Sequence, residues 1–256
     1  MESSPQKGQR RDSARIYNSP AQRFERLLQT FKAKYRSRDR HVIACLGTLI
    51  PENGVIFDIG SHHGNYAKEF ARLHQGEVQV HCFEPSPYNA AILEAVVGKL
   101  SNVTINRFAL ADHAEEADLY LPIKETGRLG TGIGHFGEEK TRDYITERVR
   151  TTTLDAYAKE RGLSRFDFLK CDVEGAEMQV LNGGSETIRR FRPTIYIEIA
   201  EEYLSRMGHC AKDVFELLGS FGYDAYQMEL GTGALRPVDG HQGPENYIFR
   251  AKDSRQ

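Results

Sequence analysis

Residues 55–66, which read Val-Ile-Phe-Asp-Ile-Gly-Ser-His-His-Gly-Asn-Tyr, constrain the fold more than any other stretch of the chain. Three apolar residues, the acid Asp58 and the glycines Gly60 and Gly64 predict a buried strand that turns tightly into a helix. Glycine at such a turn lets the backbone approach a ligand, and the free N–H groups of the helix favour an anionic group. The stretch therefore predicts a ligand-binding turn, although two glycines at this spacing also suit an ordinary turn of any α/β protein.

The spacing of the glycines argues against a nicotinamide or flavin cofactor. That fingerprint is Gly-x-Gly-x-x-Gly, and counted from Gly60 its second and third glycine positions hold His62 and Asn65. The chain has Asp-x-Gly-x-x-x-Gly instead, with Asp58 at the end of the predicted strand. An acid there suits a ligand with a positively charged amino group, and S-adenosylmethionine carries an ammonium beside a carboxylate.

A second acid stands at the end of the next predicted strand. Residues 77–85 alternate between polar and apolar side chains and end in Phe-Glu-Pro, which places Glu84 26 residues after Asp58. In nucleotide-binding α/β folds a carboxylate near this place binds the ribose diol. Asp58 and Glu84 together predict a nucleoside that lies between two successive strand ends.

The length of 256 residues predicts one full hydrophobic core. We expect a basic, disordered leader over residues 1–20, helices over 21–50 and the main domain over 51–252. The first 40 residues hold eleven Lys or Arg against four acids, although the net charge is only −2. This charge pattern favours a segment that is simply solvated, and an arm that binds nucleic acid or another anion is the alternative.

The composition also predicts where the protein works. No apolar run approaches the ~18 residues of a membrane span, and the first 20 residues lack the apolar core of a signal peptide. We therefore expect a cytoplasmic protein without a membrane partner. Neither metal-ligand nor Cys-x-x-Cys spacing occurs among the cysteines, which predicts reduced thiols without zinc: Cys45, Cys82, Cys171 and Cys210.

Strand and helix patterns alternate along the rest of the chain. Phe24, Leu27, Leu28 and Phe31 have the spacing of an amphipathic helix, which we expect to cover the sheet or the ligand mouth. Further helices are predicted over 87–100, 154–161, 175–190 and 211–221, and further strands over 103–109, 114–122, 166–172, 193–199, 223–230 and 246–250. The alternation predicts a mostly parallel sheet with helices on both faces and the ligand at the carboxyl ends of the strands.

Five glycines crowd into residues 127–137, just before a charged run. So dense a glycine stretch is not expected to be regular. A long irregular segment in a compact domain is often functional, which favours a mobile lid over the substrate, and a surface insertion is the alternative.

Three more acids follow in the second half of the chain. Asp172 ends the predicted strand 166–172, and Glu174 stands two residues later. Glu198 lies inside the apolar run 193–199, so it is paired, protonated or exposed to a cleft.

With these motifs in order, the chain resembles the FkbM family of S-adenosylmethionine-dependent methyltransferases over roughly residues 55–199. The most specific motif is the acidic run that begins at Lys170 and reads Lys-x-Asp-x-Glu-Gly-x-Glu. The other matching motifs are Asp58-x-Gly60, Phe83-Glu84-Pro85, Thr153-Leu154-Asp155, Val180-Leu181-x-Gly183 and Glu198. The resemblance implies a Rossmann-like class I fold with a seven-stranded sheet, and methyl transfer to an oxygen, often a hydroxyl of a sugar or secondary metabolite.

The resemblance also implies roles for individual residues. Around the methionine part of the cofactor it would place Asp58, Gly60, Ser61 and Gly64. Glu84 would bind the ribose, and Asp112 is the candidate for the adenine amine. Asp172, Glu174 and Glu198 would be the catalytic acids, and Glu177 completes the acidic run. The chain departs from the family at His62 and His63, where small or amide residues are usual; two adjacent histidines of a tight turn rarely bind one metal ion.

Several alternatives remain open from the residues alone. Asp172 and Glu174 either accept a proton from the acceptor or cap the next helix, as Glu177 also could. Lys170 contacts substrate or pairs with Asp172 on the same strand face. A second mechanism has Asp172, Glu174 and Glu198 hold Mg²⁺, which lowers the pKa of the acceptor.

The partner is expected to be a small hydroxylated molecule. Methyltransferases of nucleic-acid bases usually carry Asn or Asp, two prolines and an aromatic after the fourth strand, and Asp172-Val173-Glu174-Gly175 stands there instead. A protein that binds S-adenosylmethionine without catalysis is the rival from another class.

Overall fold

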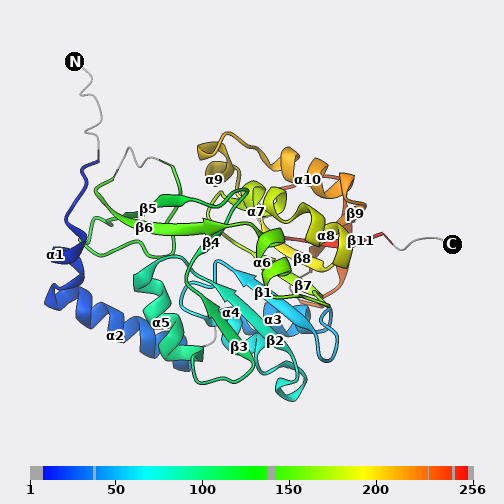
Figure 1. The fold of residues 1–256 in the computed structure, drawn as a ribbon, viewed down its shortest axis with the longest axis horizontal. Helices are drawn as coiled ribbons and strands as arrows, with labels where there is room; N and C mark the ends of the chain where they lie inside the picture. Colours follow the sequence, from blue (N-terminus) through cyan, green and yellow to red (C-terminus); the bar gives the residue numbers. More distant parts are fainter. Residues whose placement is uncertain (1–7, 37–38, 138–141, 230, 244–245, 253–256) are drawn as a thin grey trace.

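Five parallel strands form the centre of the main sheet (Figure 1). The structure, a computed structural model, describes residues 8–36, 39–137, 142–229, 231–243 and 246–252. Within them the parallel strands run side by side in the order β8-β7-β1-β2-β3. Their bounds are Thr194–Glu198 for β8, Phe168–Cys171 for β7, Val55–Ile59 for β1, Gln79–Phe83 for β2 and Val103–Asn106 for β3.

Three antiparallel strands extend the sheet beyond β8. They follow in the order β11 (Asn246–Ala251), β9 (Tyr223–Met228) and β10 (Leu235–Val238). The predicted mostly parallel α/β sheet is confirmed, with eight strands among the described residues rather than seven. The additional strand is β10, which contains Pro237, and proline is tolerated there because β10 is an edge strand.

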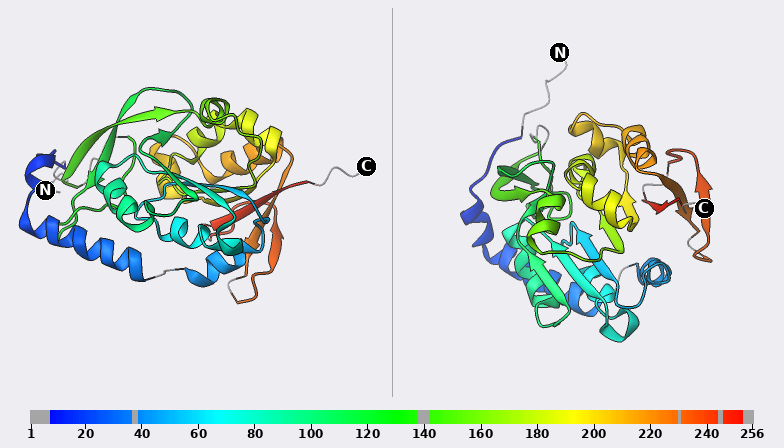
Figure 2. Two further views of the ribbon diagram at one scale, coloured as in Figure 1. Left: turned by 60° about the horizontal axis from the view of Figure 1, so that its bottom comes forward. Right: turned by 45° about the vertical axis from the view of Figure 1, so that its right-hand side comes forward.

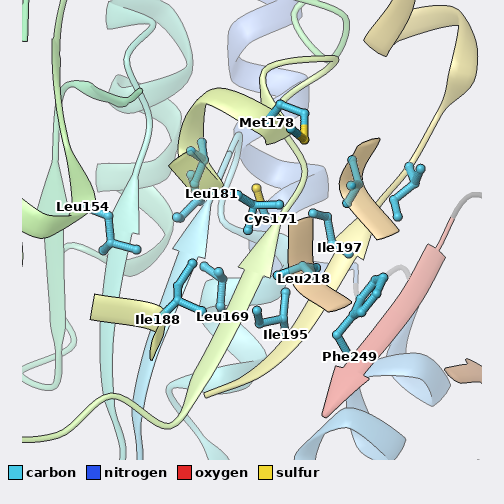
Figure 3. Close-up of a cluster of buried hydrophobic side chains, with 14 of the residues drawn as sticks. Leu154, Leu169, Cys171, Met178, Leu181, Ile188, Ile195, Ile197, Leu218 and Phe249 are labelled. Atoms are coloured by element: carbon cyan, nitrogen blue, oxygen red, sulfur yellow. The ribbon is translucent and has the colours of Figure 1, made fainter. Parts of the chain in front are cut away.

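Helices cover both faces of this sheet (Figure 2). Because side chains alternate along a strand, neighbours in β1 enter different cores: Phe57 belongs to one and Ile56 to the other. The larger core lies under helices with bounds α6 Leu154–Glu160, α7 Glu177–Gly183, α8 Ser185–Phe191, α9 Glu201–Arg206 and α10 Ala211–Ser220 (Figure 3). The second core lies under α3 Arg40–Gly47, α4 Asn65–Phe70 and α5 Pro87–Val97.

A small second sheet stands beside the main one. Its strands are β4 (Ala109–Leu110), β6 (Tyr144–Thr152) and β5 (Glu116–Pro122), in that order. The single strand predicted over 103–109 is therefore two strands that belong to different sheets. Strand β6 was not predicted because it begins inside the charged run, although its alternate residues are buried.

Two predicted helices differ in detail. The helix predicted over 175–190 is divided into α7 and α8 at Gly183 and Gly184. A Cβ on Gly183 would lie 2.0 Å from the carbonyl oxygen of Ala111, so close packing requires glycine there. The helix after the first turn ends at Phe70 in α4, and the short 3₁₀ helix Leu73–Gly76 follows.

The N-terminal helices pack differently from what the sequence predicts. Helix α1 (Ser13–Tyr17) already precedes residue 20, and α2 (Pro20–Tyr35) lies along α5. The amphipathic pattern of α2 is confirmed, but its apolar side faces solvent: Phe24, Leu27 and Phe31 are 62%, 68% and 60% exposed. The polar side is covered instead, because the amide of Gln22 donates a 2.8 Å hydrogen bond to the hydroxyl of Tyr88 on α5.

Candidate active site

The turn after β1 is held tightly between β2 and β7. The N–H groups of Gly60 and Ser61 each donate a 3.1 Å hydrogen bond to the carbonyl of Phe83, the last residue of β2. Gly60 has φ +75°, and a Cβ there would lie 1.8 Å from the carbonyl oxygen of Asp172. Only glycine therefore lets the ends of β1 and β7 approach this closely.

A cavity opens at the carboxyl ends of β1, β2 and β7. The predicted site residues in its lining are Gly60, Glu84, Asp172 and Glu174. Apolar residues from strands of the two sheets line much of the remaining wall: Ile59, Phe83, Leu110, Leu119 and Leu121. Thr131 and Phe136 line it from the glycine-rich segment. The cavity lies where a parallel α/β sheet binds its ligand.

Glu84 presents a buried carboxylate to this cavity. The N–H of Ser86 donates to Oε1 at 2.9 Å, and the N–H of His62 donates to Oε2 at 2.9 Å. Asn89 adds a longer bond to Oε1, of 3.4 Å. Burial raises the pKa of Glu84 to about 7 although these hydrogen bonds lower it. The carboxylate is thus fixed in orientation and retains lone pairs for a ligand hydroxyl.

Asp58 lies behind the turn rather than in the cavity lining. It is fully buried, and neither carboxylate oxygen accepts a hydrogen bond from the residues that the structure describes. Burial raises the pKa of Asp58, while the charge of Lys170, whose Nζ is 3.5 Å from Oδ1, lowers it. A buried carboxylate with unused acceptor capacity fits a ligand that brings a positively charged donor.

Lys170 connects the first predicted acid with the acidic run. Its Nζ donates a 3.0 Å hydrogen bond to the carbonyl of Gly60 and lies 3.1 Å from Oδ2 of Asp172. Burial lowers the pKa of Lys170, but the nearby carboxylates of Asp172 and Asp58 outweigh burial, so the pKa is raised overall. The salt-bridge interpretation of Lys170 is confirmed, and it joins two acids rather than one.

The three predicted catalytic acids come together at the ends of β7 and β8. Asp172, Glu174 and Glu198 each offer one oxygen, and these oxygens lie within 4.8 Å of one another. Burial and then the negative charges of Asp172, Glu198 and Glu177 raise the pKa of Glu174 to about 9. Glu174 therefore carries a proton at neutral pH, because so close a set of carboxylates resists full ionisation.

Glu177 stabilises the loop before α7 rather than capping the helix, because its two hydrogen-bond donors precede the N-cap residue Ala176. Its Oε1 accepts hydrogen bonds from the N–H groups of Val173 (3.1 Å) and Gly175 (3.3 Å). Gly175 has φ +108°, a conformation that glycine adopts readily and that lets the chain turn over Glu177. The carboxylate thus fixes the loop that carries Asp172 and Glu174.

Three more residues predicted to bind the cofactor are, like Asp58, outside the cavity lining. Ser61 donates a 2.6 Å hydrogen bond to the carbonyl of Asp58 and stabilises the turn. Gly64 begins α4 with φ +79°, and a Cβ there would lie 2.8 Å from Leu93 on α5. Asp112 is partly exposed and pairs with His113 at 2.6 Å.

Three residues of the cavity were not predicted from the sequence: His62, Asn89 and Thr131. All three line the cavity, and the amide of Asn89 donates a 3.1 Å hydrogen bond to the carbonyl of Thr131. The rings of His62 and His63 stack with centroids 3.6 Å apart, and burial lowers the pKa of His63 to about 4. The sequence did contain one sign of this role for His62: the residue departs from the family at the turn that was predicted to bind the ligand, and the structure places it in the cavity lining.

Comparison with known protein families shows which family the chain belongs to. The model of the methyltransferase FkbM domain matches residues 58–225, a stretch that includes every acid described above. The chain belongs to the FkbM methyltransferase family. This methyltransferase is accordingly an S-adenosylmethionine-dependent enzyme, and the resemblance drawn from the motifs is confirmed.

Individual relatives agree with that assignment. The 2-O-methyltransferase NoeI of Sinorhizobium fredii is 29% identical over 177 residues, which cover 65% of this chain and 72% of that protein. Methyltransferase sdnD of Sordaria araneosa is 27% identical over 164 residues, covering 54% and 62% of the two chains.

A solved structure supports the fold alone. The FkbM methyltransferase structure from Methylobacillus flagellatus KT aligns with a TM-score of 0.50 at 13% identity. The alignment covers 90% of this chain and 60% of that one, so this methyltransferase spans about three fifths of the neighbour's length. In the part of this chain that the structure describes, no helix has the length and apolarity that crossing a membrane would require.

Proposed function

We propose that this methyltransferase transfers a methyl group to a hydroxyl oxygen of a small molecule, with Asp172 as the proton acceptor. The observation that carries the proposal is the position of Asp172. It lines the cavity at the carboxyl ends of β1, β2 and β7, called the cofactor cavity from here on, and the ammonium of Lys170 lies 3.1 Å away as its counter-ion. The name of the relative NoeI, a 2-O-methyltransferase, supports an oxygen as the acceptor atom.

The buried acids suit the two ends of the methyl donor. Asp58, with unused acceptor capacity behind Gly60, would attract the ammonium of the methionine part, and Ser61 and Gly64 would keep the turn in shape. Glu84 would accept hydrogen bonds from the ribose hydroxyls. Leu110 lines the cavity near the expected adenine position, whereas the side chain of Asp112 pairs with His113 outside the lining.

The reaction requires in-line geometry and the removal of one proton. S-adenosylmethionine, when bound, supplies a methyl group on a positively charged sulfur. Asp172 would orient the acceptor hydroxyl and take its proton while the O–C bond forms and the C–S bond breaks. Glu174, which is protonated at neutral pH, would not compete for that proton but can donate a hydrogen bond to Asp172 or to the acceptor.

A divalent cation is the second candidate for activating the acceptor. Asp172, Glu174 and Glu198 could provide hard oxygen ligands for Mg²⁺, because one oxygen of each lies within 4.8 Å of the others. A cation would replace the proton of Glu174 and lower the pKa of the acceptor hydroxyl. The two mechanisms share their residues and differ in their response to a chelator.

The glycine-rich segment is proposed to close over the bound donor. Thr131, Gly132, Gly134 and Phe136 line the cavity from this side. Opening would break the hydrogen bond from Asn89 to Thr131 and the backbone hydrogen bonds that join Gly130 to Pro122 and His135 to Tyr120 of β5, so the closed position is the favoured one once the donor is bound. Trypsin should cut after Arg128 more slowly when S-adenosylhomocysteine is bound; equal rates with and without it would contradict a lid.

The test of the main proposal is substitution of the acids in a labelled-methyl assay on pooled hydroxylated metabolites. Asp172→Asn should retain donor binding in calorimetry and lower kcat by ~10²-fold or more, because the amide cannot accept a proton. Asp224→Asn is the matched control, since Asp224 is exposed on β9 and forms an ion pair with Lys252 on the surface. Loss of wild-type activity in chelator, restored by Mg²⁺, would establish the metal mechanism instead.

Two further outcomes bear on the proposal as a whole. Full turnover by both Asp172→Asn and Glu174→Gln would reduce the acidic run to a helix cap. Donor binding without transfer to any acceptor would favour the non-catalytic alternative.

A further inference from the structure

A second cavity of about 470 Å³ meets the cofactor cavity at Asp172. It lies on the face of the sheet that carries α3 and α4, at the carboxyl end of β8. Its polar lining residues are Asp39, Tyr66, Asp172, Tyr196, Glu198, Gln227 and Asn246, and its apolar ones are Val42, Met228 and Ile248. Since Asp172 lines both cavities, a molecule in the second cavity can reach the residue that is proposed to take the proton.

The charge of this cavity selects against anions. Among the described residues of its lining, every charged side chain is an acid: Asp39, Asp172 and Glu198. The ammonium of Lys170, beside Asp172, is buried and already surrounded by two carboxylates and the carbonyl of Gly60. Arg236 is outside the lining and already donates hydrogen bonds to Gln227 and Gln242. A phosphate or carboxylate on the ligand would therefore meet like charge without a free cation.

One wall of the cavity is aromatic. Tyr66 on α4 and Tyr196 on β8 stack with ring centroids 6.3 Å apart and an interplanar angle of 30°. Tyr196 is only 7% exposed, so its ring belongs to a packed wall and not to a mobile surface. Such a wall offers an apolar face to the C–H groups of a ring, while the acids and amides around it accept or donate hydrogen bonds to hydroxyls.

A buried amide supplies an independent sign of a ligand. Gln227 on β9 is 91% buried, and its Nε2 has no hydrogen-bond partner among the described residues. Its Oε1 accepts a 2.8 Å hydrogen bond from Arg236, which fixes the orientation of the amide. A buried donor without a partner is costly, and a ligand oxygen in the cavity would satisfy it.

We infer that this second cavity binds the methyl acceptor, and that the acceptor is an uncharged polyhydroxylated ring compound. The inference rests on the proposed O-methylation and adds the acceptor's place, its lack of negative charge and the residues that select it. Asp172 faces the reacting hydroxyl, the Tyr66–Tyr196 wall receives the ring, and Gln227 donates to a second oxygen of the acceptor.

A third cavity is the structural rival. It has about 350 Å³, shares Phe136 and Ala176 with the cofactor cavity, and is bordered by Met207. Asp172 is not part of its lining. Because Met207 and Met228 are both half-buried methionines at the edge of a cavity, Met207→Trp and Met228→Trp form a matched pair that fills one cavity each.

The experiment uses the full chain with methyl-labelled S-adenosylmethionine and two acceptor panels, methyl glycosides of hexoses and the corresponding hexose phosphates. The wild type should methylate a member of the neutral panel and none of the phosphorylated one. On that acceptor Met228→Trp should lower kcat/KM by about 10²-fold and Met207→Trp by less than about twofold, with donor binding unchanged in both. Gln227→Leu should raise KM by about tenfold and leave kcat unchanged, because it removes one hydrogen-bond donor to the acceptor.

Each result decides a different point. Transfer to the phosphorylated panel, or a larger loss in Met207→Trp than in Met228→Trp, would overturn the inference while leaving O-methylation intact. If no sugar is methylated, ligand-observed NMR on the neutral panel follows. Binding that Met228→Trp abolishes would support the cavity and contradict methyl transfer to these hydroxyls, whereas no binding would overturn the inference.

Discussion

Substitution of Lys170 by methionine is expected to destabilise the fold strongly, and more than the same substitution at the buried Lys68. Lys170 is 3% exposed and is the counter-ion of both Asp58, which is fully buried, and Asp172. Methionine keeps the length of the side chain but leaves the carboxylate of Asp58 buried without an opposite charge. Removing one partner of a buried pair costs about 3–5 kcal/mol of unfolding free energy.

Lys68 provides the matched control for this prediction. It is 4% exposed, and its Nζ donates hydrogen bonds to the carbonyls of Ala33 (2.7 Å) and Arg36 (3.1 Å). Lys68→Met leaves these carbonyl groups unpaired, whereas the carboxylate of Glu69, 3.7 Å from Nζ, still has Arg72 at 3.5 Å as a second cation. The expected cost is therefore roughly 1–3 kcal/mol. Equilibrium unfolding in guanidinium chloride should place Lys170→Met well below Lys68→Met in stability, with similar m-values.

The pH dependence gives the decisive sign. Without Lys170, the pKa of Asp58 in the folded protein rises further above its unfolded value of ~3.9. A raised folded pKa means that protonation stabilises the folded variant at low pH and that this stability is lost as the pH rises through the folded pKa. The free energy of unfolding that Lys170→Met loses relative to the wild type should thus be smaller at pH 5 than at pH 8. Adding Asp58→Asn to Lys170→Met should recover part of that loss at pH 8. A deficit that is independent of pH, or smaller than that of Lys68→Met, would refute the reasoning.

Three further predictions follow from burial, space and charge. Because the pKa of Glu84 is about 7, calorimetry should show donor affinity falling up to ~10-fold per pH unit below pH 7, and Glu84→Gln should bind more weakly at pH 8 without that dependence. Gly60→Ala should cost at least about 3 kcal/mol in denaturant unfolding, because its Cβ would meet a carbonyl oxygen at 1.8 Å, whereas Gly127→Ala, with open space around it, should cost only ~1 kcal/mol. Phe31→Ser should change stability by less than ~0.5 kcal/mol, while Phe70→Ala, at a fully buried position, should cost about 3–5 kcal/mol.

Local pattern sufficed for the elements of the central sheet, because a buried parallel strand requires an apolar run whatever surrounds it. It failed where partners far along the chain decide the outcome. The apolar spacing of Phe24, Leu27 and Phe31 predicts a helix, but which side is covered depends on Tyr88 of α5, which hydrogen-bonds to Gln22. Likewise, the break between α7 and α8 depends on the carbonyl of Ala111, which lies too close to admit a side chain at position 183.

The acids of the site were predictable as residues but not as a network. Strand periodicity places Lys170 and Asp172 on one face, and this was visible in the sequence. The structure adds that β1 and β7 are neighbours, 112 residues apart, in a register that sets Asp58 opposite Lys170. Because of that register, the ammonium of Lys170 is the counter-ion of two carboxylates: that of Asp58, which is proposed to bind the methyl donor, and that of Asp172, which is proposed to accept the proton. The same pairing brings the carbonyl of Asp172 against Gly60, so the glycine of the first motif and the acid of the last are required by a single close approach of two strand ends.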